Sequence, residues 1–192
     1  MDIRQFFFKY RGFTPVPLVL TVIYFARPTV ESFLLGLLIM VVGESLRLWG
    51  VSYAGGATRT RNVGAPRLVT AGPFSRVRNP LYLGNMIIYT GAALIANVWM
   101  PWLIFVVWIF FGIQYYLIVQ LEEGKLSELF GEEYLEYKKR VPRFIPRFIP
   151  VTTGNQVKPD IPGAIRSEKS TFISFAVILL LFVGKMIFFP KI

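Results

Sequence analysis

Five long apolar stretches constrain the fold of this sequence more than any other feature. They cover residues 13–26, 30–53, 80–96, 102–120 and 171–189, with polar or charged residues between them. Apolar runs of about 20 residues are typical of helices that cross a bilayer, because a helix satisfies its backbone hydrogen bonds internally. The first run is short and can reach across only if the aromatic residues at 6–8 lie in the interface. The sequence therefore predicts an all-α fold, a polytopic membrane helical bundle of about five transmembrane helices.

Composition supports a membrane protein and excludes several kinds of site. Hydrophobic residues make up 54% of the 192 residues, yet the formal net charge is +10. That combination is more usual in multi-span membrane proteins than in soluble domains. No nucleic-acid motif accompanies the basic excess, so we expect no nucleic-acid partner. The chain has neither cysteine nor histidine, which excludes a disulfide framework, a thiolate metal site and a histidine-based triad, and we expect no metal.

The basic residues are distributed unevenly about the expected spans. With the N-terminus in the cytoplasm, most of the 21 Lys and Arg residues fall on that side, in the N-terminal segment, the loop 54–79 and the segment 122–169. Positive charge in short loops favours the cytoplasmic side. The sequence therefore predicts an integral, multi-pass protein with a cytoplasmic N-terminus, and it places the start of the third span at the cytoplasmic face.

The start of the third expected span carries residues suited to bind an anion. Asn79 is a good N-cap, because its side-chain oxygen can accept from an unpaired amide of the first turn, and Pro80 suits the first helical position. Arg76 and Arg78 lie beside these amides at the positive end of the helix dipole. Gly84, one turn further, would let a ligand approach the backbone. An ordinary capped helix with membrane-anchoring arginines explains the same residues equally well.

Two pairs of charged residues lie at or near the expected spans. Glu44 and Arg47 are three residues apart on one face of the second span, where they either face a site or pair with each other and snorkel. Glu122 and Glu123 follow the fourth span directly. The short connection at 97–101 predicts that the third and fourth spans form a helical hairpin. The hairpin would bring both carboxylates near the basic helix start, although a solvated helix exit is the simpler interpretation for them.

The chain after the fourth span divides into three parts. Residues 122–140 have apolar side chains at helical spacing and predict a cytoplasmic amphipathic helix, interrupted at Gly131 and followed by a C-terminal cap. Residues 143–150 repeat Arg-Phe-Ile-Pro, whose prolines predict extended chain with its apolar side chains packed on the protein. A polar linker follows at 151–168, and Ser170 can cap the last span. We expect a core at 1–150, and a linker with an extra transmembrane helix at 151–192.

The segment 68–84 resembles the signature of the isoprenylcysteine carboxyl methyltransferase and phospholipid methyltransferase family. That pattern is Arg-His-Pro-x-Tyr-x-Gly at a helix start, then a hydrophobic span, then Glu-Glu. The matching residues are Arg78, Pro80, Tyr82, Gly84, Glu122 and Glu123. The closing segment 130–146 is also similar, so the resemblance covers about 43–150. The usual histidine of the family is Asn79 here, and an amide cannot take up a proton near neutral pH, which excludes a mechanism that needs an imidazole base.

The resemblance implies an integral-membrane methyltransferase that moves a methyl group from S-adenosylmethionine to a lipid-like or prenylated acceptor at the cytoplasmic face. The acceptor type would be an isoprenylcysteine carboxylate or a phospholipid amine. The implied cofactor-binding residues are Arg78, Asn79, Pro80, Tyr82, Gly84, Glu122, Glu123, Tyr134, Tyr137 and Arg143. The residues expected in catalysis and acceptor selection are Arg47, Glu44 and Asn79. Arg59 and Arg61 either contact the acceptor as well or, as the favoured interpretation, only attract anionic lipid. For the two tyrosines, a helix packed on the membrane face is an equal alternative.

Two other function classes remain open at this point. A membrane reductase of the sterol-reductase type has a broadly similar cytosolic region but binds a nicotinamide cofactor. A non-catalytic scaffold or small transporter would need polar residues along its spans. The Glu-Glu position and the lack of histidine argue against the reductase, and the gathering of polar residues at one face argues against the transporter.

Overall fold

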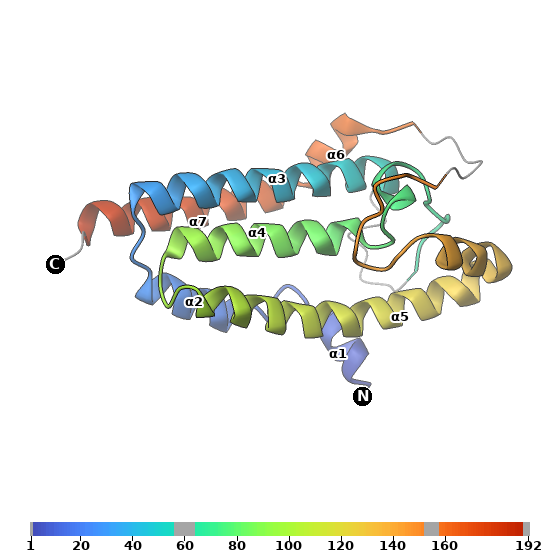
Figure 1. The fold of residues 1–192 in the computed structure, drawn as a ribbon, viewed down its shortest axis with the longest axis horizontal. Helices are drawn as coiled ribbons and strands as arrows, with labels where there is room; N and C mark the ends of the chain where they lie inside the picture. The colour runs from blue at the N-terminus through green and yellow to red at the C-terminus, as the bar shows by residue number, and fades with distance from the viewer. Residues whose placement is uncertain (1, 56–63, 152–157, 190–192) are drawn as a thin grey trace.

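A computed structural model describes residues 2–55, 64–151 and 158–189 of the chain. The described part contains seven α-helices and a short 3-10 turn, and no strand occurs in it. The helices are α1 (Ile3–Tyr10), α2 (Val16–Phe25), α3 (Val30–Ala54), α4 (Pro80–Ala96), α5 (Trp102–Arg140), α6 (Ile161–Ser167) and α7 (Lys169–Phe188), and the 3-10 turn is η2 (Gly72–Ser75). Figure 1 shows α3, α4, α5 and α7 running along the same long axis, which confirms the predicted helical bundle.

Two pairs of facing glycines form the closest contact in the bundle, between α3 and α4. Gly36 of α3 faces Gly91 of α4, and Gly43 faces Gly84, so the two glycines of each helix are seven positions apart. A Cβ built on Gly43 would lie 2.8 Å from the carbonyl oxygen of Gly84. Small residues of this kind let membrane helices approach backbone to backbone and gain dispersion contact. The pairing fixes the antiparallel register of α3 and α4, and with it the position of the α4 N-terminus.

Three of the described helices are long and apolar enough to cross a membrane, namely α3, α5 and α7. The helix α4 has 17 residues and α2 only 10, so α2 is about 15 Å long, half of a hydrocarbon core. Three of the five predicted spans therefore form helices of sufficient length and apolarity, whereas the stretches at 13–26 and 80–96 form shorter apolar helices, so five spans are not shown. Large apolar side chains remain exposed on the outer faces of these helices, for example Leu34 and Leu38 of α3, as suits a lipid environment.

The helix α5 is much longer than a single span and changes direction at Gly131. Its 39 residues include Gly131 in a non-helical, left-handed conformation with φ 49°. The last turns, before Val141, fold back toward the bundle (Figure 1). The predicted break at Gly131 is confirmed. Because the chain reverses there, the end of α5 and the segment after it cover the N-terminus of α4 and form the predicted C-terminal cap.

Three local predictions from the sequence are wrong. Asn79 occupies the N-cap position of α4, but its side chain makes no capping hydrogen bond and donates instead to the carbonyl of Arg143 at 3.2 Å. Ser170 does not cap α7, because this helix begins one residue earlier, after Glu168. The expected linker contains α6, whose first turn is capped by the Asp160 carboxylate accepting from the Gly163 amide at 2.9 Å.

The packing expected for the Arg-Phe-Ile-Pro repeat is also wrong for three of its apolar side chains. The segment is non-helical, as the prolines require, and contains bends, but Ile145, Phe148 and Ile149 are exposed by 81%, 96% and 74%. These side chains therefore do not cover the protein core.

Candidate functional site

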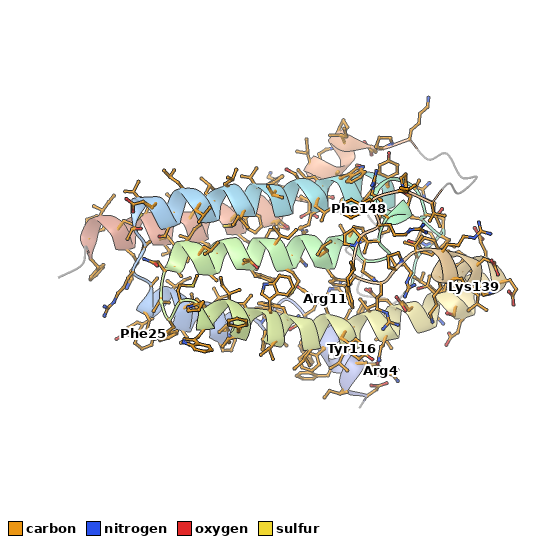
Figure 2. All side chains as sticks on the ribbon, in the orientation of Figure 1. Arg4, Arg11, Phe25, Tyr116, Lys139 and Phe148 are labelled. Atoms are coloured by element: carbon orange, nitrogen blue, oxygen red, sulfur yellow. The ribbon has the colours of Figure 1, made fainter. Side chains whose placement is uncertain are left out.

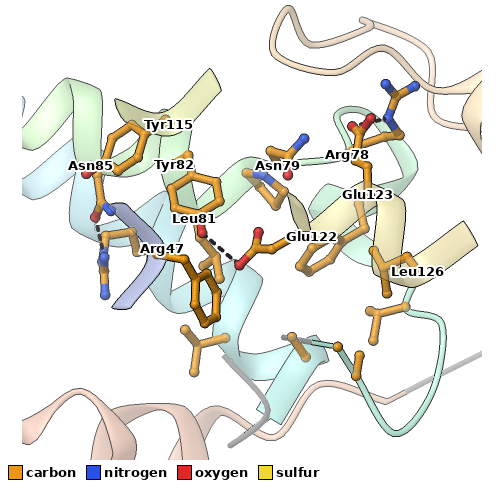
Figure 3. A pocket seen from close by; sticks show the side chains of 18 of the residues that line it. Arg47, Arg78, Asn79, Leu81, Tyr82, Asn85, Tyr115, Glu122, Glu123 and Leu126 are labelled. Carbon is orange, nitrogen blue, oxygen red and sulfur yellow. Dashed lines mark hydrogen bonds and ion pairs between the residues drawn. The ribbon is translucent and has the colours of Figure 1, made fainter. Parts of the chain in front are cut away.

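A cavity of about 560 Å³ lies where the N-terminus of α4 meets the middle of α5. It is walled by the first turn of α4, by α5 around the two adjacent glutamates, and by the loop 64–69. The N-terminal residues Phe8 and Arg11 and, from the other end of the chain, Glu168 and Thr171 complete the lining. Figure 3 shows the polar side chains of α4 and α5 facing one another across this space.

Glu123 is the centre of one end of the site. It is 4% exposed, and its carboxylate accepts from Arg78 Nε at 3.0 Å and from Arg143 Nη2 at 2.7 Å. The hydrogen bond to this carboxylate raises the pKa of the Arg143 guanidinium above its usual value. A buried carboxylate held by two guanidiniums is well compensated for the loss of water. Glu123 therefore acts mainly to fix the two arginines.

Arg78 also ties the end of α5 to the start of α4. Its Nη1 donates to the carbonyls of Lys138 at 2.9 Å and Val141 at 2.7 Å, which lie at the C-terminus of α5. Its backbone amide donates to the carbonyl of Pro142 at 2.9 Å. A helix C-terminus leaves carbonyls without partners, and a guanidinium satisfies two of them here. The segment 138–143, called the cover below, is thus held against Arg78, which lines this end of the cavity.

Glu122 faces the cavity from the next position of α5. Its carboxylate accepts from the Tyr82 hydroxyl at 2.9 Å (Figure 3). The Tyr82 ring lies 4.6 Å from the ring of Tyr115, centroid to centroid, so the hydroxyl is held in place by aromatic packing. Glu122 and Tyr82 together present a fixed polar pair to whatever enters the cavity.

A second cluster of charges, around Arg47 of α3, lies at the other end of the cavity. Arg47 Nη2 donates to the Glu168 carboxylate at 2.8 Å, and Nη1 donates to the side-chain oxygen of Asn85. Glu44 lies one turn earlier, with its carboxylate 3.2 Å from Arg47 Nε. Glu168 is 1% exposed and comes from the start of α7. The pairing predicted as one alternative for Glu44 and Arg47 is therefore present, and Arg47 also lines the cavity.

Tyr134 and Tyr137 lie at the end of α5, between the cavity and the segment that follows this helix. They pack with Leu68 and Val141 in a small apolar cluster beneath the cover, and both also line the cavity. The Tyr137 hydroxyl donates to the carbonyl of Phe74 at 2.8 Å. These aromatic side chains give the cavity an apolar part of its lining.

The structure brings most of the predicted site residues to this one cavity. Those that line it are Arg47, Arg78, Asn79, Pro80, Tyr82, Glu122, Glu123, Tyr134 and Tyr137. Gly84 is not among the lining residues, because its open side is filled by Arg47 Cγ and the Gly43 carbonyl of α3. Arg143 reaches the site through Glu123, and Glu44 through Arg47. Arg59 and Arg61 lie outside the described residues.

Three cavity residues have no place in the sequence prediction. Asn85 follows the recognised pattern by one residue, and a helical wheel of α4 could have placed it beside Arg47. Glu168 is an acidic residue directly before an apolar span, a position that signals an exposed helix start as readily as a buried contact. Arg11 lies in the N-terminal segment, where its charge indicated topology only.

Comparisons with known proteins identify the family that this chain resembles over most of its helical part. The family described as "Phospholipid methyltransferase" matches residues 31–133, more than half of the chain. A human protein-S-isoprenylcysteine O-methyltransferase is 36% identical over 117 residues, 58% of this chain and 40% of the relative. An Arabidopsis thaliana protein-S-isoprenylcysteine O-methyltransferase B is 32% identical over 117 residues, 57% of its length.

Not all similar proteins carry a methyltransferase name. The nickel-cobalt-cadmium resistance protein NccN of Alcaligenes xylosoxydans xylosoxydans is 32% identical over 115 residues, 59% of this chain and 48% of the relative. The chain spans about half the length of the curated relatives it matches. No solved structure matches it.

Proposed function

The chain belongs to the phospholipid methyltransferase family, and we propose that it transfers a methyl group from S-adenosylmethionine to a lipid-like acceptor at the cytoplasmic face of a membrane. The observation that carries the proposal is the cavity in which the family-pattern residues of α4 and α5 meet. Arg78 and Glu123, which are 45 residues apart in sequence, are joined there by an ion pair of 3.0 Å.

The residues present fit the chemistry of this cofactor. The volume of the cavity, about 560 Å³, falls within the usual range of ligand pockets, about 300–1,000 Å³. Glu122 offers an acceptor for an ammonium group or for ribose hydroxyls, and the amides at the start of α4 offer donors for a carboxylate. Tyr134 and Tyr137 offer an apolar surface for an adenine ring. Glu123 serves this site through the arginines that it holds.

The chain's own residues would bind, orient and exclude water. When bound, S-adenosylmethionine supplies a methyl group on a positively charged sulfur, which leaves as a neutral thioether. Such a transfer needs alignment and desolvation more than acid–base help. The cover at 138–143, held by Arg78, shields one end of the cavity from water, and Tyr82 fixes Glu122 in place. Asn79 holds the cover through Arg143 and takes up no proton.

The acceptor would approach from the end of the cavity near Arg47. This end is lined by residues of α3, α4 and α7, helices that carry exposed apolar side chains. An amphiphile could therefore place its polar group beside Arg47 while its apolar part stays among the helices. The isoprenylcysteine methyltransferases among the relatives are the reason to propose a prenylated or phospholipid-like acceptor.

Equilibrium binding to the full chain in detergent tests the cofactor part of the proposal. Titration calorimetry should show that S-adenosylhomocysteine binds and that NADPH binds much more weakly. Glu122→Gln should weaken binding at least about tenfold, which is about 1.4 kcal/mol. Glu128→Gln is the matched control, because Glu128 is exposed on the same helix and pairs with Lys125. Tighter binding of NADPH, or equal affinities of the two variants, would contradict the assignment.

Methyl transfer itself requires a second measurement. The protein is incubated with S-adenosylmethionine labelled in its methyl group and a total lipid extract, and labelled products are separated and identified. We expect label in a lipid or prenylated product. A protein that binds S-adenosylhomocysteine and labels no product would contradict the methyltransferase proposal while leaving the binding site intact.

A further inference from the structure

The second half of the Arg-Phe-Ile-Pro repeat presents apolar side chains away from the protein. Phe148 is 96% exposed and Ile149 is 74% exposed, and Ile145 of the first copy is 81% exposed. These residues belong neither to the bundle core nor to the cavity lining. Three large apolar side chains on five consecutive positions form a surface that water does not favour.

The backbone beneath these side chains is held firmly. The amide of Arg147 donates to the carbonyl of Arg76 at 3.0 Å, and the amide of Val151 donates to the carbonyl of Ser75 at 2.9 Å. The Arg76 guanidinium donates to the carbonyl of Phe148. The exposed side chains are therefore carried on an irregular segment that is hydrogen-bonded to the loop before α4.

Basic side chains surround the apolar surface. Arg76 and Arg147 flank it directly, and Lys138, Lys139 and Arg140 lie at the nearby end of α5, where Arg147 Nη1 donates to the carbonyl of Arg140 at 2.8 Å. Among the acidic residues of that helix end, Glu136 pairs with Lys139 at 2.6 Å. The balance of charge next to the surface is positive.

The surface lies level with the ends of two membrane helices. Figure 2 labels Phe148 beside the ends of α3 and α4, not beyond them along the bundle axis. The segment is attached to α4 at its first residues, since Arg78 and Asn79 both bond to carbonyls of 142–143. Residues at that level of a membrane protein lie in the headgroup region of the bilayer.

We propose that residues 145–149 form a lipid-binding surface, in which Ile145, Phe148 and Ile149 enter the headgroup and acyl boundary of the leaflet where α4 begins. The flanking arginines and lysines bind the phosphates of anionic lipids there. Aromatic and aliphatic side chains next to basic ones are the combination that binds an anionic interface. A second copy of the chain would bury the apolar tips equally well, but it would bring the same positive charges together.

The absence of cysteine in the sequence permits a direct test by site-directed spin labelling. Phe148→Cys carries the label on the full chain in vesicles of phosphatidylcholine with phosphatidylglycerol, and accessibility to oxygen is compared with accessibility to a water-soluble nickel complex. Glu128→Cys is the control, because Glu128 is 69% exposed on α5. We expect the label at 148 to favour oxygen by several-fold relative to 128. The label at Ile149→Cys should behave in the same way, which guards against a local effect of one substitution.

Three outcomes would overturn the proposal. Equal accessibility at 148 and 128 would place the surface in water. Dipolar broadening between labels on different molecules would identify a second copy as the occupant. The same accessibility ratio in vesicles of phosphatidylcholine alone would remove the role of anionic lipid. None of these outcomes depends on whether the protein transfers a methyl group.

Discussion

The glycine pairs between α3 and α4 predict a specific cost for adding one methyl group. In Gly91→Ala, the new Cβ would lie 2.5 Å from the Gly36 carbonyl oxygen and 2.8 Å from the Met40 amide nitrogen. Both are backbone atoms, so no side-chain rotation can relieve the contact. Ordinary contacts begin near about 3.5 Å, so α4 would have to move away by up to about 1 Å and lose much of the dispersion energy along the glycine pairs. Overpacking of this kind costs about 1–3 kcal/mol.

Gly112→Ala on α5 is the matched control for this substitution. A Cβ at Gly112 would have no atom within 4 Å, so the same change there adds no contact. Alanine is favoured over glycine within a helix by about 0.8–1 kcal/mol in both variants. The difference between the two variants therefore isolates the overpacking, and we expect it to be about 1–3 kcal/mol.

Thermal unfolding in detergent, followed by circular dichroism, measures this difference. For a chain of this size about 1 kcal/mol changes the Tm by about 2–4 °C, so Gly91→Ala should unfold about 2–12 °C below Gly112→Ala. Gly184→Ala on α7, also without a neighbour within 4 Å, should behave like Gly112→Ala. Equal Tm values for all three would refute the view that the α3–α4 contact depends on these glycines.

Three further predictions concern the cavity. Glu168→Ala should lower the free energy of unfolding by about 1.5–3 kcal/mol, because the buried guanidinium of Arg47 loses a charged partner at 2.8 Å; an unchanged Tm would contradict this. Tyr82→Phe should weaken S-adenosylhomocysteine binding about fivefold, roughly 1 kcal/mol, because Glu122 loses the hydrogen bond that orients it. Titration calorimetry measures this change in affinity. Arg143→Lys keeps the charge but loses the bidentate contact with the Glu123 carboxylate. The affinity for S-adenosylhomocysteine should therefore fall about tenfold, about 1.4 kcal/mol. Unchanged affinity would show that a positive charge alone at this position is enough to hold the cover.

The sequence was sufficient where local rules and tertiary packing agree. Pro80 was predicted as the first residue of a helix ending at 96, and α4 has those bounds. The short connection at 97–101 makes α4 and α5 antiparallel neighbours. Glu122 and Glu123, more than five turns into α5, therefore lie beside the start of α4, as predicted. A continuous apolar run and a short turn contain all the information that this prediction needed.

The predictions failed where a side chain had two competing partners. Asn79 could cap its own helix or reach across to Arg143, and only the folded position of 142–143 decides between them. Glu168 could face solvent at a helix start or reach Arg47, 121 residues away in the chain. The exposed Phe148 shows a third limit, since the apolar character of a residue does not by itself say whether it packs in the protein core.

The contact between Glu168 and Arg47 bears on the smallest piece of the chain that can work. The family match ends at residue 133, and a gene cut at residue 150 would still encode the whole family pattern. The shortened protein would nevertheless lose a wall of its cavity and the carboxylate that holds Arg47 at 2.8 Å. Glu168 and the start of α7 thus belong to the cavity wall, and deletion boundaries for this protein are better drawn after α7 than at the end of the shared sequence.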